Sequence, residues 1–184
     1  HQAIAVINRN HTAMMDIAFA DGRLFVSNAG VGFEALISDK FTHSRRRGLA
    51  MYAWLTIKHL WQYKPLEWDI EIDGKKITER AFIVTVANGQ QFGYNFHIAP
   101  TADWQDGLLD LVIVKKFSWV PGLIIALRSL TGSLLKSPYV RHFRGKEIVI
   151  SHPGLKLVQT DGDAHECASP LHFSILHQAQ KVIL

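Results

Sequence analysis

Two acidic side chains stand two residues apart in Thr160-Asp161-Gly162-Asp163, around a dipeptide typical of tight turns. At such a turn both carboxylates can point toward one side of the chain. A hydroxyl group becomes a useful nucleophile when a nearby carboxylate takes its proton, so Asp161 or Asp163 could act as a general base. The alternative is a structural turn, because Asp and Gly are turn residues in any fold. Taken alone, these residues favour the structural interpretation.

A second acidic turn contains Asp103, Asp106 and Gly107 directly before a predicted strand. Oxygen ligands on a turn suit a hard cation such as Mg²⁺, and waters can complete the coordination shell. The alternative is an Asp-Gly turn that serves only to start the strand. A single carboxylate ligand is weak evidence for a metal site, so the residues alone favour the structural alternative.

Glycines next to asparagines, in Asn28–Gly32 and in Asn88-Gly89, could bring the backbone close to a ligand. Isolated glycines at strand ends are more often bulges or turns.

Other catalytic classes lack their motifs. The sequence contains no phosphate-binding Gly-x-x-x-x-Gly-Lys-Ser/Thr, no Gly-x-Gly-x-x-Gly and no Gly-x-Ser-x-Gly. The pair His165 and Cys167 offers too few ligands for a closed zinc site.

Four Asp-Gly dipeptides, beginning at Asp21, Asp73, Asp106 and Asp161, divide the chain into short apolar segments. Asp-Gly readily adopts the positive φ angles of hairpin turns, so the first two predict hairpins. The hairpin strands are expected at 15–19 with 24–26 and at 68–72 with a run ending at 82–86. Further strands are expected at 3–7, 108–114, 147–150, 155–158, 171–176 and 181–184.

Helical periodicity is confined to a few segments. Between Leu49 and Lys64 one stripe of the sequence is apolar, which predicts an amphipathic helix that ends before Pro65; the stripe consists of Ala50, Ala53, Trp54, Ile57, Leu60 and Trp61. Ser118 can cap a second helix running to about Leu135, and a shorter helix is expected after Gly32. Aromatic residues at helical spacing usually face inward, so Trp54, Trp61 and Trp119 are expected in the core. The alternative is that these helices line an acyl groove or contact a membrane.

Many short strands in hairpin order with few helices predict a mainly β fold of packed antiparallel sheets.

The 184 residues are 48% hydrophobic and 20% charged, which is ordinary for one globular domain. A single cysteine excludes an internal disulfide and fits a reducing compartment. The longest apolar stretch, 119–127, is too short to span a membrane. The net charge of +4 favours anionic partners through its field or serves solubility.

Several segments, taken in order, resemble one enzyme family. They are Asn28-Ala-Gly-Val-Gly-Phe-Glu-Ala35, the run from Ala87 to Pro100, and Asp106-Gly-Leu-Leu-Asp110. Together they resemble diacylglycerol kinases of the bacterial type and their sphingosine and ceramide kinase relatives. Asp161-Gly-Asp163 stands where that family usually carries Asp-Gly-Glu. The resemblance covers nearly the whole chain but only the second half of such an enzyme.

The resemblance implies an antiparallel β-sandwich that forms the C-terminal domain of an ATP-dependent lipid kinase. It places the general base at Asp163 or Asp161, and it places Asn88 and Gly89 toward the cofactor. It also implies a Mg²⁺ site made of the Asp106 carboxylate with backbone carbonyls of Asp103 and Leu108. The family's Gly-Gly-Asp-Gly-Thr element is absent, so ATP would be bound mainly by an N-terminal α/β domain outside this chain.

We therefore expect residues 1–184 to form a single β-rich domain, cut or processed from a longer protein and inactive by itself. Its expected partners are a lipid substrate and ATP, in the cytoplasm, with no nucleic acid. A peripheral membrane contact and a homodimer stay open. Two alternatives remain: an NAD-kinase-like domain that phosphorylates a soluble nucleotide, and a binding module that keeps the fold without catalysis.

Overall fold

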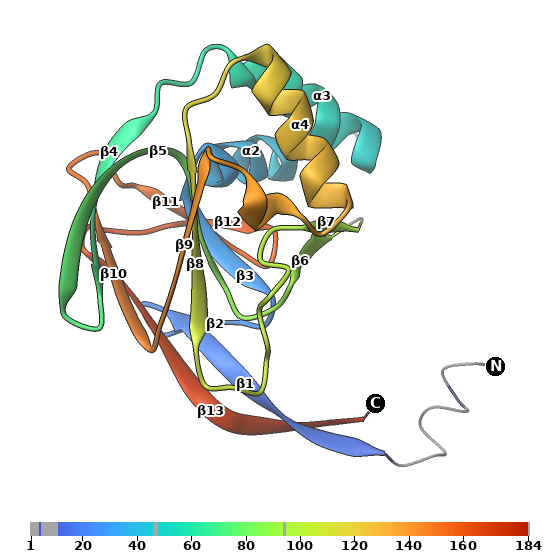
Figure 1. The fold of residues 1–184 in the computed structure, drawn as a ribbon, viewed down its shortest axis with the longest axis vertical. Helices are drawn as coiled ribbons and strands as arrows, with labels where there is room; N and C mark the ends of the chain where they lie inside the picture. The colour runs from blue at the N-terminus through green and yellow to red at the C-terminus, as the bar shows by residue number, and fades with distance from the viewer. Residues whose placement is uncertain (1–3, 5–10, 46–47, 94, 184) are drawn as a thin grey trace.

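The computed structural model describes residues 4, 11–45, 48–93 and 95–183, and a large, curled antiparallel sheet forms its frame (Figure 1). The hairpins predicted from Asp-Gly are confirmed. β1 (Thr12–Ala20) turns into β2 (Arg23–Phe25), and β4 (Leu66–Ile72) turns into β5 (Lys75–Ala87). Both turn residues have positive φ in each case, which matches the right-handed twist of the flanking strands.

The strand order is β12-β11-β3-β5-β4-β10-β13-β1-β2, and every pairing within it is antiparallel. β5 joins the parts of the sheet. Its first half pairs with β4, while its second half lies between β3 and β8, and β8 also pairs with β9. The remaining bounds are β3 (Asn28–Gly32), β8 (Leu109–Lys115), β9 (Val140–Gly145), β10 (Glu147–Ser151), β11 (Leu157–Thr160) and β12 (Asp163–Glu166). The predicted mainly β, sandwich-like class is confirmed.

Some strands differ from the prediction. The two strands expected near the C-terminus are one continuous strand, β13 (Leu171–Ile183), which bends where Gln178 adopts a φ of 49°. β13 pairs along its length with β1, with a register shift between Met15 and Ile17. The strand expected at 3–7 lies outside the described residues, apart from Ile4. β6 (Gln91–Gly93) and β7 (Phe96–His97) form a separate small ribbon.

The helices gather at one end of the sheet (Figure 1). α2 (Phe33–Thr42) and α3 (Leu49–Leu60) confirm two predicted helices. α4 (Trp119–Leu130) ends earlier than predicted, because Gly132 adopts a φ of 66° that breaks the helix before the short 3₁₀ turn η1 (Leu134–Lys136). None of the helices described is long and apolar enough to cross a bilayer.

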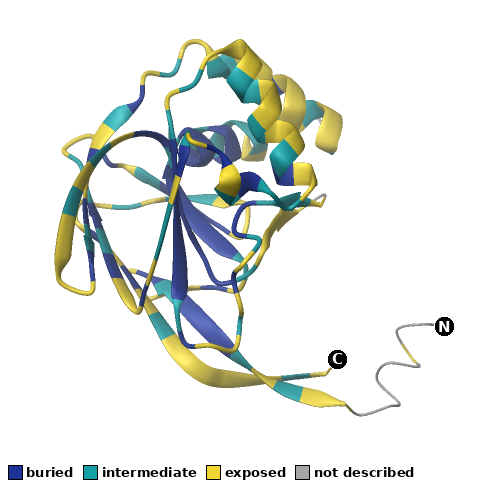
Figure 2. Cartoon of the chain, viewed as in Figure 1, coloured by how far each residue is buried: buried dark blue, intermediate teal, exposed yellow. Residues whose placement is uncertain are grey.

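Buried residues follow the strands, whereas much of α3 and α4 is exposed (Figure 2). The main core lies inside the sheet and includes Trp68, Phe25 and Phe173. A smaller cluster joins α2, α3 and β5. The prediction that Trp54, Trp61 and Trp119 are core residues is wrong: Trp54 of α3 is 51% exposed, Trp61, directly after α3, is 45% exposed, and Trp119 of α4 is 67% exposed. The side of α3 that packs inward carries Leu55, against α2 and β5, whereas most of the predicted stripe, including Ala53, Trp54 and Ile57, is exposed.

Candidate functional site

The Asp161-Gly162 turn connects β11 to β12 and carries the two acids that the sequence singles out. Asp161 has a φ of 49°, and its carboxylate turns back toward the start of β3. There it accepts hydrogen bonds from the backbone amides of Val26, Ser27 and Asn28, at 2.7, 2.8 and 3.1 Å. Three amides on one carboxylate fix both the side chain and the turn.

Asp163 lies in a different environment. It is the first residue of β12, its backbone pairs with Thr160, and it is exposed. Its carboxylate accepts no hydrogen bond from the described part of the chain. The carbonyl oxygen of Gly162 accepts a short hydrogen bond from the Ser38 hydroxyl, which ties the turn to α2. The turn therefore presents one carboxylate held by backbone amides and one exposed carboxylate that the described residues leave without a hydrogen-bond donor.

Asn28 is buried at the centre of this site. Its side-chain oxygen accepts a hydrogen bond from Gln159 Nε2 at 2.8 Å, and its Nδ2 donates to the Gln91 carbonyl at 3.1 Å. Gln159 in turn accepts the Gly162 amide at 2.9 Å. Ser27 Oγ donates to the same Gln91 carbonyl at 2.6 Å. This network, absent from the sequence-based prediction, joins the Asp161 turn to β3 and β6.

The predicted cofactor-binding residues Asn88 and Gly89 meet the same segment. Their backbone amides both donate to the Ser27 carbonyl, at 2.9 and 2.8 Å. The buried Asn88 side chain donates from Nδ2 to the carbonyls of Val26 and Asp16, each at 3.0 Å, and its Oδ1 is buried without a partner among the described residues. Asp161, Asn88 and Gly89 thus converge on residues 26–28, whereas Asp163 does not contact this segment.

The predicted metal turn is folded by its own hydrogen bonds. Asp103 Oδ1 accepts the Gln105 amide and Asp106 Oδ1 accepts the Leu108 amide, both at 3.0 Å. The second oxygen of Asp106 forms an ion pair with Arg144. The oxygen donors have the chemistry that Mg²⁺ prefers, but a cation bound by Asp106 must displace Arg144. No cluster of three or more His, Cys, Asp or Glu side chains suited to a metal occurs in the described part of the chain.

Asp16 is a buried acid that the sequence analysis missed. Its carboxylate accepts the amides of Gly107 at 2.7 Å and Gln178 at 2.6 Å, and it contacts His177 Nδ1 at 2.8 Å. Its carbonyl is one of the two that Asn88 binds. Asp16 thus connects the Asp106-Gly107 turn to Asn88. The available signal was one acid inside the otherwise apolar run of β1.

Glu34, at the start of α2, is a second buried acid near the site. The Thr85 hydroxyl lies 2.9 and 3.0 Å from its two carboxylate oxygens. Burial raises the pKa of Glu34 well above its usual value, and the Thr85 hydrogen bond offsets part of that rise. A Cβ at Gly30 would lie 1.3 Å from Glu34 Oε1. The missing side chain at Gly30 therefore makes room for Glu34.

Comparison with known proteins assigns this architecture. The family model described as "YegS C-terminal NAD kinase beta sandwich-like domain" matches residues 27–184. A diacylglycerol kinase of Mycobacterium tuberculosis (strain ATCC 25618 / H37Rv) is 27% identical over 161 residues, which cover 86% of this chain and 52% of that protein. The uncharacterized protein sll0036 of Synechocystis is 28% identical over 168 residues, 88% of this chain and 39% of that protein.

A solved structure has the same fold. The crystal structure of a diacylglycerol kinase from Bacillus anthracis str. Sterne superposes with a TM-score of 0.68 at 20% sequence identity, covering 99% of this chain and 57% of that one. The chain spans about half the length of the curated relatives it matches.

Proposed function

Because this chain belongs to the family of YegS C-terminal NAD kinase beta sandwich-like domains, we propose that it forms the C-terminal part of an ATP-dependent lipid kinase. The kinase transfers the γ-phosphate of ATP to a lipid hydroxyl. The relative from Mycobacterium tuberculosis that is named a diacylglycerol kinase supports a diacylglycerol-like substrate. A sphingoid base is the second lipid to test.

The observation that carries this proposal is the contrast between the two acids of the Asp161-Gly162-Asp163 turn. Both residues are exposed, but Asp161 is restrained by three backbone amides, whereas the Asp163 carboxylate accepts no hydrogen bond from the described residues. A general base needs an accessible oxygen in a fixed position. Asp161 fixes the position of the turn, and Asp163 offers the carboxylate oxygen that accepts the proton.

In the proposed reaction Asp163 accepts the proton of the lipid hydroxyl while the oxygen of that hydroxyl attacks the γ-phosphorus. The bond from that phosphorus to the bridging oxygen breaks, and ADP leaves with the electron pair. Asp161 positions Asp163 by holding the turn against residues 26–28. Asn88 and Gly89 border the same segment and are proposed to face the cofactor.

We propose that ATP binds mainly to a second domain outside this chain, since the chain has no glycine-rich phosphate loop. Mg²⁺, when bound, neutralises charge on the transferred phosphate. Asp106 with the carbonyls of Asp103 and Leu108 is the proposed protein contribution to its binding.

The test is a phosphotransfer assay of the intact protein with labelled ATP, offered diacylglycerol, a sphingoid base or NAD. We expect a labelled lipid, and Asp163→Asn should abolish most of it while the protein stays folded. The 184-residue chain alone should label nothing. Labelled NAD with no labelled lipid would contradict the lipid assignment and favour a nucleotide kinase. Lipid labelling by the isolated chain would contradict the need for a second domain.

A further inference from the structure

Three Asp-Gly turns of this fold connect hairpin strands, and each is attached to a neighbouring strand in the same way. Asp21, Asp73 and Asp161 adopt a positive φ, and so does the glycine after each of them. The carboxylate of Asp21 accepts the His172 amide at 3.0 Å, and that of Asp73 accepts the Lys146 amide at 3.0 Å. The three amides bound by Asp161 repeat this pattern. The attachment through the aspartate is therefore common to these turns.

Gly162 distinguishes the third turn from the other two. Its amide donates to Gln159 Oε1 at 2.9 Å, and its carbonyl accepts a hydrogen bond from the Ser38 hydroxyl. Among the residues that the structure describes, no side chain binds the backbone of Gly22 or Gly74 in this way. Since those two hairpins form without such bonds, hairpin formation does not require them at Gly162.

The side chains that bind Gly162 are buried, although Gly162 itself is exposed. Ser38 is 2% exposed and Gln159 is 3% exposed. Gln159 Nε2 donates to Asn28 Oδ1 at 2.8 Å, so Oε1 is the end of the Gln159 amide that faces Gly162. A buried polar side chain needs a partner to offset its desolvation, and each of these two has the exposed glycine as a partner.

Ser38 reaches the turn from α2, which is packed on two sides. Phe33 and Ile37, one helical turn apart, belong to the cluster that joins α2, α3 and β5. Glu34 and Ser38, also one turn apart, form the hydrogen bonds to β5 and to the β11–β12 turn. The contacts of the first side therefore fix the helix from which Ser38 donates.

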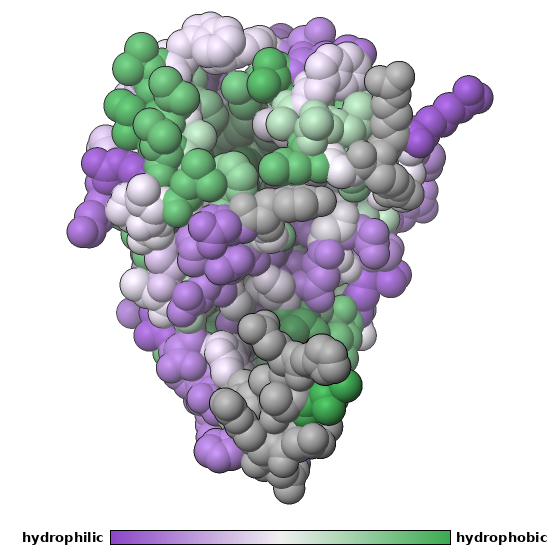
Figure 3. Space-filling model, turned by 90° about the vertical axis from the view of Figure 1, so that its right-hand side faces the viewer, coloured by the Kyte–Doolittle hydropathy of each residue, from purple (hydrophilic) through white to green (hydrophobic). Residues whose placement is uncertain are grey.

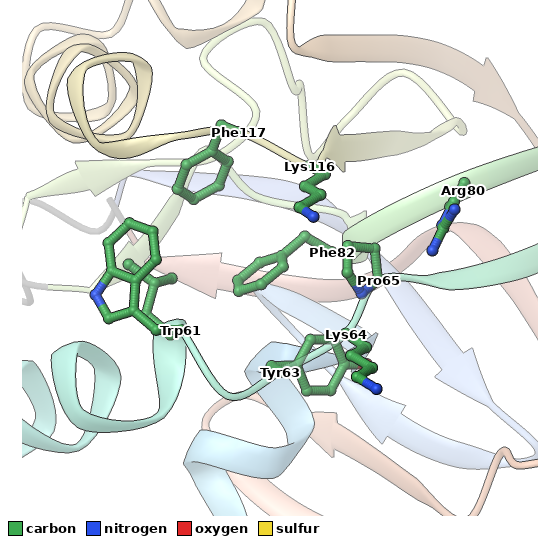
Figure 4. Close-up of a pocket in the computed structure, with 9 residues that line it drawn as sticks. Trp61, Tyr63, Lys64, Pro65, Arg80, Phe82, Lys116 and Phe117 are labelled. Carbon is green, nitrogen blue, oxygen red and sulfur yellow. The ribbon is translucent and has the colours of Figure 1, made fainter.

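The packing of α2 continues into the end of the molecule where Figure 3 shows hydrophobic side chains gathered above a more polar body. The Phe33 ring lies 4.5 Å from the Phe82 ring and 5.4 Å from the Tyr63 ring, measured between centroids. Phe82 and Tyr63 also line a pocket of about 540 Å³, shown in Figure 4. Closely packed rings limit the movement of α2, so Ser38 meets the turn from a restrained position.

We propose that Ser38 and Gln159 are positioning residues for the proposed phosphoryl transfer and act through Gly162 on Asp163. The Gly162 amide belongs to the peptide plane before this residue, and its carbonyl belongs to the plane after it. The two hydrogen bonds therefore fix both planes. Glycine has the freest backbone of all residues, and Gly162 has a φ of 96°, so without these bonds the planes could rotate.

The position of Asp163 depends on the second of these planes, because Asp163 follows Gly162 directly. A catalytic group is most effective when it is held within about 0.5 Å of its productive position. The Asp163 carboxylate accepts no hydrogen bond from the described residues, so the backbone has to orient it. A Cβ at Gly162 would meet no atom within 4 Å, which leaves open space beside the turn for a substrate hydroxyl. This inference rests on the proposed role of Asp163 as the general base.

The experiment measures phosphotransfer to diacylglycerol by the intact protein with labelled ATP, in the wild-type and the Asp163→Asn backgrounds. Ser38→Ala and Gln159→Leu should each lower kcat about 10- to 100-fold at saturating lipid, because the base is displaced. The KM for lipid should change by less than about twofold, since neither side chain contacts the substrate. In the Asp163→Asn background the same substitutions should change the residual kcat by less than about twofold, because no base is left to position.

The matched control is Ser129→Ala. Ser129 is a buried serine of α4 whose hydroxyl donates to the His97 carbonyl at 3.0 Å, so the substitution removes the same kind of hydrogen bond outside the Asp161 turn. It should leave kcat like that of the wild type. Circular dichroism and urea unfolding show whether each variant is folded under the assay conditions.

The outcomes separate this inference from the proposed function. A wild-type kcat in Ser38→Ala would overturn the role of Ser38, and a wild-type kcat in Gln159→Leu would overturn that of Gln159. Equal losses of kcat in both backgrounds would show that these side chains do not act through Asp163 and would overturn the inference, while a loss in Asp163→Asn would still support the proposed base. A near-normal kcat in Asp163→Asn would overturn the proposed base and this inference with it.

Discussion

The carboxylate of Asp161 accepts the backbone amide of Ser27 at 2.8 Å, across 134 positions of sequence. The neighbouring amides of Val26 and Asn28 donate to the same carboxylate. These hydrogen bonds connect the β11–β12 hairpin to the start of β3. The carbonyl of Ser27 also accepts the amides of Asn88 and Gly89. The hydrogen bonds to Asp161 separate the roles of the two acids in the turn, since Asp161 has its partners within the fold.

Exchanging each acid for its amide tests that separation. Asp163→Asn should lower kcat at saturating lipid by about 10²- to 10⁴-fold, because the proton acceptor is lost. Its free energy of unfolding should change by less than about 0.5 kcal/mol, since the side chain is exposed. Asp161→Asn should lower the free energy of unfolding by about 1–3 kcal/mol, because an amide nitrogen cannot accept from the backbone amides. Urea unfolding and steady-state kinetics of both variants provide the comparison.

The opposite pattern has a clear meaning. A large loss of kcat in Asp161→Asn with unchanged stability would move the base to Asp161. Near-normal kcat in both variants would place the base outside this chain.

The hairpins were predictable because their information is local. Asp-Gly at Asp21 and Asp73 adopts positive φ at consecutive residues, and a two-residue turn then fixes the pairing of the flanking strands. The strand β3 was not predicted, since Asn28-Ala-Gly-Val-Gly32 has little intrinsic strand preference. It is a strand because β5 and β11 pair with its two edges and Glu34 occupies the space above Gly30.

Long-range contacts limited the prediction of the site. The acids at 161 and 163 could be found from their spacing, but nothing in the sequence shows that residues 26–28 bind Asp161. The orientation of α3 was misjudged for a related reason. Periodicity identifies an apolar stripe on a helix but not whether other elements cover it, and here only Leu55 of α3 is buried.

The ion pair between Asp106 and Arg144 gives a test of the predicted metal turn. Arg144→Gln removes the competing cation, so the half-saturating Mg²⁺ concentration of the intact protein should fall by up to about fivefold. Asp106→Asn should raise that concentration. Arg141→Gln is the matched control, because Arg141 pairs with Glu79 instead. Identical Mg²⁺ titrations for all three variants and the wild type would contradict Mg²⁺ binding at this turn and leave it a structural role only.

Glu34 predicts a pH dependence of stability. Its pKa is raised by burial, so between about pH 4.5 and its folded pKa the native state keeps a proton that the unfolded state releases. Stability from this group is therefore fully present below about pH 4.5 and falls as the pH rises through that window. Glu34→Gln keeps an acceptor for Thr85 and removes the titration. Urea midpoints should fall less steeply with pH in the variant; parallel pH profiles would contradict a buried neutral Glu34.

Asp16 should hold the Asp106-Gly107 turn in place although it lies on another strand. In Asp16→Asn only one side-chain oxygen remains, so at least one of the amides of Gly107 and Gln178 loses its acceptor. We expect the free energy of unfolding to fall by about 1–3 kcal/mol, since a buried donor is left unpaired. Hydrogen exchange should accelerate at Gly107 and Gln178 but not at Lys75 and Ile72, where the β4–β5 hairpin has its own pairing. Asp69→Asn, at an exposed acid of β4, is the control and should leave those rates unchanged. Uniformly faster exchange throughout the sheet in Asp16→Asn would show a general loss of stability, and unchanged exchange at Gly107 would show that the turn stands without Asp16.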